Sequence, residues 1–142
     1  MAVEIKLHPL DFEPDVAIGI DLPLVGDNGS TFKQTYTTLD QAVANAKNLL
    51  LTDQGERIML PTFGCNLKKT LFENLTEDTL LDLEADIRNN FTYWLPYIFI
   101  NELILQPTED LNRLNIKITI SLEGNKFDTR SVELEININA PL

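Results

Sequence analysis

The sequence predicts an α+β domain in which helices pack on one face of a small, mainly antiparallel sheet that ends in a C-terminal β-hairpin. Apolar residues recur at helical spacing in segments between residues 39 and 94, and they alternate with polar residues in the last third of the chain. The length of 142 residues suits one compact domain. We expect an extended N-terminal arm over residues 1–36 and a single domain over residues 37–142.

The arm is rich in proline and glycine, which disfavours a regular helix. It contains Pro9, Pro14 and Pro23, followed by a turn cluster at residues 26–30. Its apolar residues recur at every second position, as in a strand that lies on a surface. An arm that is apolar on one side is expected to dock either on its own domain or on a neighbouring protein. The alternating residues are Val16, Ile18, Ile20, Leu22 and Leu24.

The first helix is predicted from about Leu39 to Leu51. Thr38 and Gln41 have the spacing of a capping box, in which each side chain satisfies a free backbone donor. A short strand is then expected over the partly apolar residues 56–60, and Pro61 is expected to end it.

Two more helices are predicted before the sheet. Leu67 and Leu71 indicate a short helix, and a longer helix is expected from about Glu77 to Trp94. Thr76 suits the N-cap of the longer helix, and Pro96 disfavours its continuation. Its expected buried stripe is Leu80, Leu83, Ile87, Phe91 and Trp94.

The last third of the chain is predicted to form strands. Residues 97–106 are rich in isoleucine, phenylalanine and leucine, and residues 113–139 contain two alternating runs. A short link with Gly124-Asn125 joins these runs, which is typical of a hairpin. One apolar and one polar face are typical of an antiparallel sheet that helices cover on one side.

Composition excludes several classes of function. The formal net charge of −11 disfavours binding to phosphate backbones and to anionic membrane surfaces. No run approaches the ~20 apolar residues of a membrane-spanning helix, and the N-terminus does not resemble a signal peptide, so we expect synthesis in the cytoplasm. The single cysteine, Cys65, and the single histidine, His8, cannot form a disulfide or a zinc site together.

No residue pattern predicts catalysis, a metal or a cofactor. Asp78, Asp82 and Asp86 share one stripe of the long helix and are expected to be a solvated acidic face. A nucleophilic Cys65 would need a base, so a buried, inert thiol is the better interpretation. The junction of residues 94–97 has two open interpretations: a corner of the core, or an aromatic surface that meets a partner.

Residues 52–76 carry a recognisable pattern. Gly55-Glu56-Arg57, the run from Pro61 to Leu67 with its Phe-Gly-Cys core, and the run from Leu71 to Thr76 resemble the baseplate wedge and sheath-initiator family of contractile-tailed bacteriophages. This family is grouped with the GPW proteins, and its members are sometimes labelled lysozyme-like. The resemblance covers about residues 38–140.

The resemblance implies a structural virion protein, made in the host cytoplasm and located in the tail baseplate. Its implied partners are other wedge subunits, the tail sheath subunit and tail-tube or hub proteins, with no nucleic acid, membrane or cofactor. The family usually has Glu-Pro-Arg after its long helix, where this chain has Leu95, Pro96 and Tyr97. With Trp94, these residues are therefore expected to contact the inner helical bundle of the wedge through apolar and aromatic groups.

The implied assembly step is strand addition, in which the first ring of sheath subunits extends the sheet of this protein. The hairpin of residues 113–139 is the expected acceptor, without an indication of which strand is the open edge. Two alternative functions are a cell-wall glycosidase, which needs two carboxyl groups beside a cleft, and a host-side binding adaptor of the same fold. The residues assigned to sheath contact are Lys117, Glu133, Glu135, Ile136 and Ile138.

Overall fold

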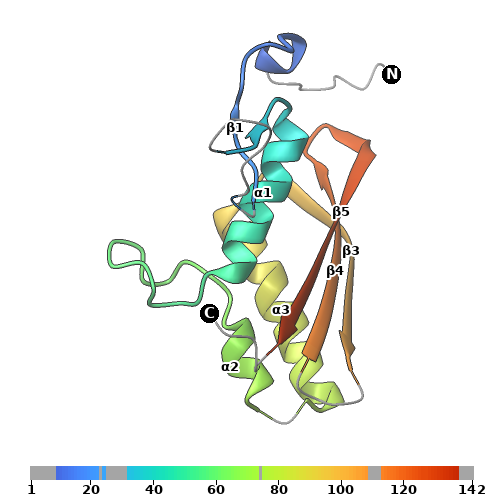
Figure 1. The fold of residues 1–142 in the computed structure, drawn as a ribbon. Coiled ribbons are helices and arrows are strands. Elements are labelled where there is room, and N and C mark those ends of the chain that lie inside the picture. The colour runs from blue at the N-terminus through green and yellow to red at the C-terminus, as the bar shows by residue number, and fades with distance from the viewer. Residues whose placement is uncertain (1–8, 23, 25–31, 74, 109–112, 138–142) are drawn as a thin grey trace.

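The computed structural model describes residues 9–22, 24, 32–73, 75–108 and 113–137. Its main helices are α1 (Thr38–Leu51), α2 (Leu67–Leu71) and α3 (Glu77–Trp94). The strands β3 (Ile98–Pro107), β4 (Arg113–Leu122) and β5 (Asn125–Asn137) form an antiparallel sheet in the order β3-β4-β5. In Figure 1, α1 and α3 lie on the same side of this sheet. The predicted α+β class, with helices on one face and a C-terminal hairpin, is confirmed.

One core joins the helices to the sheet. The alternating apolar residues of β4 point toward the helices and are almost fully buried, while α1 covers β4 and β5 and α3 covers β3. The α3 stripe enters the same core through Leu83, Ile87 and Phe91. No helix in the described residues is both long and apolar enough to span a membrane. The buried residues of β4 are Leu114, Ile116, Ile118 and Ile120.

Helix α1 begins one residue earlier than predicted, and the expected Thr38 capping box is wrong. Thr37 is the N-cap, and its hydroxyl accepts a hydrogen bond from the Asp40 amide at 3.2 Å. The amide and hydroxyl of Thr38 instead donate to Asp11 Oδ1, at 2.7 and 2.8 Å. Asp11 belongs to the arm, so a residue distant in sequence satisfies the start of this helix.

The described part of the arm lies along α1. It contains a short 3₁₀ helix (Pro9–Phe12) and two short strands, β1 (Gly19–Ile20) and β2 (Gln34–Thr35), which pair antiparallel. The Thr35 hydroxyl donates to Gln41 Oε1 at 2.6 Å, and Lys47 Nζ donates to the Leu22 carbonyl at 2.8 Å. The arm is thus held on its own domain by polar contacts. Val16, Ile20 and Leu24 remain exposed.

The predicted strand over residues 56–60 is wrong, because this segment forms turns. The Leu60 amide donates to the Arg57 carbonyl at 3.2 Å, and the Gly55 amide donates to the Pro61 carbonyl at 2.8 Å. These bonds close the loop on itself and leave no strand partner. Its tip exposes Ile58 and Met59, which are 93% and 89% accessible.

Helices α2 and α3 agree with the predictions. The Thr76 hydroxyl accepts from the Thr79 amide at 3.3 Å, as an N-cap does, and α3 ends before Pro96. The acidic stripe of Asp78, Asp82 and Asp86 is exposed.

Candidate functional site

The exposed face of the sheet carries cross-strand ion pairs between β4 and β5. Lys117 Nζ lies 3.2 Å from Glu133 Oε1, and Arg113 Nη1 lies 3.3 Å from Glu135 Oε1. Exposed pairs of this kind add little stability, so their main effect is to keep this face hydrated. Ile136 points the other way and is buried against the helices. Ile138, the last residue assigned to sheath contact, lies outside the described residues.

The two edges of the sheet are β3 and β5, because β4 is paired on both sides. The Thr108 amide donates to the Arg113 carbonyl and the Glu123 amide to the Tyr97 carbonyl, so odd-numbered residues of β4 bond toward β3. Even-numbered residues of β4 therefore bond toward β5, since antiparallel pairs alternate. Their partners on β5 are also even-numbered, from Arg130 to Ile136.

It follows that the odd-numbered residues of β5 direct their backbone groups away from the sheet. Among the described residues these groups belong to Thr129, Ser131, Glu133, Glu135 and Asn137, in a stretch without a register shift. A three-residue bulge at residues 126–128 separates this stretch from the hairpin turn. The free edge of β5 is thus regular over five successive outward residues, each with one amide donor and one carbonyl acceptor.

The β3 edge is less regular. Its register shifts between Ile100 and Glu102, which marks a bulge at Asn101. At its other end, Pro107 pairs with Leu114 and has no amide hydrogen to offer at the outer edge. Bulges and edge prolines are the usual means of blocking strand addition. Of the two edges, β5 is therefore the better acceptor for an added strand.

The junction of residues 94–97 is partly buried. Leu95 caps α3 and is buried, whereas Pro96 is exposed. The Tyr97 hydroxyl accepts from Asn45 Nδ2 at 2.7 Å, which ties the junction to α1. Trp94 makes an edge-to-face contact with Phe63, with ring centroids 5.2 Å apart.

Sequence reasoning missed Tyr93, the most exposed aromatic residue beside this junction. Its ring packs edge-to-face on Trp94, with centroids 4.9 Å apart, yet 75% of the residue is accessible. Tyr93 lies outside the apolar stripe of α3, so the helical spacing of apolar residues does not single it out. The accessible aromatic surface is therefore that of Tyr93 and part of Trp94, with Pro96 next to them.

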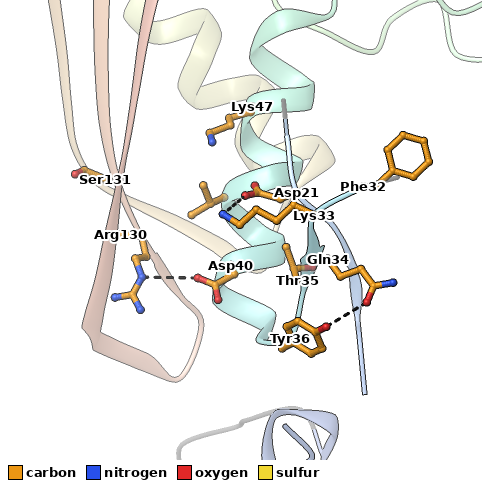
Figure 2. Close-up of a pocket in the computed structure, with 11 residues that line it drawn as sticks. Asp21, Phe32, Lys33, Gln34, Thr35, Tyr36, Asp40, Lys47, Arg130 and Ser131 are labelled. Atoms are coloured by element: carbon orange, nitrogen blue, oxygen red, sulfur yellow. Dashed lines mark hydrogen bonds and ion pairs between the residues drawn. The ribbon is translucent and has the colours of Figure 1, made fainter. Parts of the chain in front are cut away.

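A cavity of about 610 Å³ lies between the arm, α1 and β5 (Figure 2). Arg130 and Ser131 of β5 line one side, and Gln34 and Thr35 of β2 line the other, with α1 behind them. No sequence pattern indicates this cavity, because its walls are brought together only by the docking of the arm. Its remaining lining residues are Asp21, Phe32, Lys33, Tyr36, Asp40, Val43 and Lys47.

The cavity walls carry charges of both signs. Arg130 Nε lies 3.9 Å from Asp40 Oδ1, and Lys33 Nζ lies 3.0 Å from Asp21 Oδ2. Partial burial opposes ionisation of Asp21, but the hydrogen bonds from Lys33 and from the Leu22 amide outweigh it and lower the pKa of this carboxyl.

Cys65 lies apart from these surfaces. It is buried, and desolvation together with the nearby Asp86 carboxylate raises the pKa of its thiol to about 12. The nucleophilic thiolate is therefore scarce at neutral pH. His8 lies outside the described residues. Within the part of the chain that the structure describes, no cluster of three or more His, Cys, Asp or Glu side chains has the geometry of a metal site.

Known proteins share both the sequence pattern and the fold. Residues 38–126 match the family model described as Baseplate wedge protein gp25. The Baseplate wedge protein gp25 of Enterobacteria phage T4 is 30% identical over 88 residues, which cover 62% of this chain and 67% of that protein.

Two solved structures have a similar fold. A proposed tail lysozyme from Geobacter sulfurreducens superposes with a TM-score of 0.60 at 22% identity, over 72% of this chain and 92% of that one. A chain of the six-fold symmetrised baseplate of the anti-feeding prophage superposes with a TM-score of 0.62 at 24% identity, over 77% of this chain and 86% of that one. At these identities the two structures support the fold alone.

The family match covers most of the predicted domain and includes the Phe-Gly-Cys segment on which the resemblance was based. The described arm precedes the matched residues, so it is not part of the pattern that the family shares. The chain belongs to the Baseplate wedge protein gp25 family and is a wedge component of a tail baseplate.

Proposed function

We propose that this protein nucleates assembly of the contractile sheath by offering the free edge of β5 to a strand of a sheath subunit in the first ring. Strand addition gains affinity from backbone hydrogen bonds and specificity from the side chains that flank them. The protein would thereby template the first sheath ring from its place in the baseplate.

The regular edge of β5 carries this proposal. Its outward backbone groups, from Thr129 to Glu135, are in one continuous register, whereas β3 is interrupted by a bulge and ends at Pro107. An incoming strand can therefore form several consecutive hydrogen bonds at β5. Charged Glu133 and Glu135 flank these groups on the exposed face and would limit pairing between free copies before assembly.

We propose a second contact, with the inner helical bundle of the wedge, at the junction of α3 and β3. The accessible part of this junction is Tyr93, Pro96 and the outer part of Trp94, while Leu95 is buried and positions them. Aromatic side chains of this kind are common at the centre of protein interfaces. The contact is expected to be apolar, because this chain has leucine and tyrosine on either side of the proline.

The proposed role is structural and involves no enzymatic step or cofactor. The phage T4 relative is named as a baseplate wedge protein, and this supports a structural role. One fold neighbour is named as a tail lysozyme, so murein hydrolysis by this protein is tested directly with the purified full chain and dye-labelled murein. We expect no dye release above a buffer control, and release that depends on the protein would contradict the structural role.

Proline substitution tests the β5 edge. Glu133→Pro removes one amide hydrogen that points away from the sheet and leaves the bonds to β4 intact. An edge strand tolerates proline at a position of this kind. Glu133→Ala is the matched control, because it removes the same side chain and keeps the amide. Each variant replaces the native chain in the contractile particle, and negative-stain electron microscopy counts tails that carry a sheath.

We expect bare tubes with Glu133→Pro and sheathed tails with Glu133→Ala. Circular dichroism of the purified variants controls for folding, and immunoblotting of purified tails controls for incorporation. Normal sheaths on tails that contain folded Glu133→Pro protein would refute strand addition at β5.

A further inference from the structure

The loop between α1 and α2 presents a group of large apolar side chains to solvent at its tip, residues 58–60. Ile58 and Met59 are almost fully accessible, and Leu60 is exposed beside them. Residues 58–67 contain no charged side chain, although charged residues make up 23% of the chain. Figure 1 shows the loop projecting from the helices, away from the three-stranded sheet. Single exposed apolar residues are ordinary, so what distinguishes this tip is that they are grouped.

The base of the loop holds this tip in one shape. Besides the backbone bonds that close the loop, the Asp53 amide donates to Glu56 Oε2 at 3.1 Å. The half-buried Arg57 ties the loop to α1, because its Nη2 donates to Asn48 Oδ1 at 3.1 Å. Its guanidinium also lies 4.1 Å from the centre of the Phe63 ring, within cation–π range. A tip that is preorganised in this way loses little conformational freedom when it binds a partner.

The loop belongs to the part of the chain that the baseplate wedge family shares. It lies within residues 38–126, which match the family model, whereas the arm precedes them. The residues that carry the family resemblance flank the tip on both sides, as Gly55-Glu56-Arg57 before it and the run from Pro61 to Leu67 after it. These flanking residues form the turns and contacts that hold the tip. A partner for the tip is therefore expected among the other components of the baseplate.

The loop also adjoins the aromatic junction at the end of α3. Phe63 of the loop packs edge-to-face on Trp94, with ring centroids 5.2 Å apart. Trp94 packs in turn against Tyr93, with centroids 4.9 Å apart. A series of ring contacts thus runs from the base of the loop to the accessible surface of Tyr93. One partner can therefore contact both the loop tip and the junction.

We propose that the loop tip is an apolar anchor, which inserts Ile58 and Met59 into a groove between apolar helices of another wedge subunit. The inference rests on the proposed function, because the partner is taken to be the same helical bundle that contacts Tyr93 and Trp94. It goes beyond that function by assigning the main anchor to the loop. Packed helices form grooves between their side-chain ridges, and a projecting tip without charge fits an apolar groove of this kind.

Side-chain replacement tests the anchor. Ile58→Ser and Met59→Ser, separately and together, are compared with Phe127→Ser, which removes an equally exposed apolar side chain from β5. The accessible fractions are 93%, 89% and 91%. Wedge complexes purified from cells that lack the gene for this protein are the binding partner, and affinity for each purified full-length variant is measured at two salt concentrations. We expect the double variant to lose affinity at least about tenfold, by the same factor at both salt concentrations, and the control to change little.

The same assay with Tyr93→Ala separates the anchor from the junction contact. Weaker binding by both the loop variants and Tyr93→Ala supports both. If Tyr93→Ala weakens binding while the loop variants match Phe127→Ser, the anchor is refuted and the junction contact stands. If only the loop variants weaken binding, the junction contact is refuted and the anchor is supported. Urea unfolding midpoints equal to that of the native chain confirm that the variants remain folded.

Photocrosslinking identifies the occupant of the tip in the assembled particle. Benzophenone-alanine is introduced at Met59 in the full chain, with Phe127 as the comparison position, and tails are irradiated before mass spectrometry. We expect Met59 to label a helical segment of another wedge subunit, and Phe127 not to label that segment. Labelling of a sheath or tail-tube subunit from Met59, or no labelled protein at all, would overturn the anchor.

Discussion

The loop between α1 and α2 depends on a glycine at position 64, and replacing it with alanine should be costly. Gly64 has a φ of +117°, in the region that side-chain-bearing residues rarely adopt. An added Cβ would collide with the Thr52 carbonyl oxygen and lie 2.9 Å from the carbonyl carbon. That same oxygen accepts the Cys65 amide hydrogen at 3.0 Å, so the backbone cannot move aside without losing this bond.

The expected loss of stability in Gly64→Ala is the sum of backbone strain, the lost hydrogen bond and the collision of the added Cβ. Left-handed strain contributes about 1–2 kcal/mol, and loss of the buried hydrogen bond contributes about 1 kcal/mol. With the remaining collision added to these two contributions, Gly64→Ala is expected to lower the free energy of unfolding by roughly 3 kcal/mol. Gly55 provides the control, because its φ is +92° but no atom lies within 4 Å of an added Cβ. Gly55→Ala should therefore cost only the strain, about 1 kcal/mol.

Urea unfolding of both variants measures the difference. Tryptophan fluorescence is a suitable signal, because Trp94 contacts Phe63 of the same loop. The midpoint should fall further for Gly64→Ala than for Gly55→Ala, with unchanged m-values. Equal losses in the two variants would show that the Thr52 carbonyl does not constrain position 64, and would refute the reasoning.

Three further predictions concern other contacts. The Cys65 thiol, whose pKa is raised to about 12, should resist iodoacetamide at pH 8 until urea unfolds the protein; fast alkylation of the folded chain would contradict its burial. Thr37→Ala should lower the free energy of unfolding by about 1 kcal/mol, and Thr37→Ser, which keeps the capping hydroxyl, should cost less; equal unfolding midpoints for both would argue against the cap. Because the pKa of Asp21 is lowered from 3.8, its pairing with Lys33 should be complete above about pH 4 and lost as pH falls through the folded pKa. Limited proteolysis of the arm by pepsin over this range should accelerate less in Asp21→Asn than in the native chain, and identical profiles would contradict the pairing.

The periodic parts of the fold were predictable from sequence. Both long helices and the C-terminal hairpin follow from patterns that local geometry imposes, so their bounds agree with prediction within one or two residues. The strand expected over residues 56–60 failed because its apolar residues face solvent. A short apolar run indicates burial only if the tertiary fold supplies a partner, and no local pattern reports that.

The candidate site was less predictable. The cap of α1 was misplaced because Thr38 bonds to Asp11, a residue 27 positions away in sequence. The choice between edges depends on a bulge at Asn101 and on the direction of backbone groups on β5, neither of which the alternating pattern reveals. The cavity depends on the docked arm, whose polar contacts with Gln41 and Lys47 have no periodic signature.

A high-resolution cryo-electron microscopy map of the assembled baseplate with its first sheath ring tests the central claim most directly. We predict a strand from a sheath subunit paired with β5 at the usual spacing of about 4.8 Å, over residues 129–135. Density for sheath strands along β3, or an unpaired β5 in a fully sheathed particle, would contradict the account.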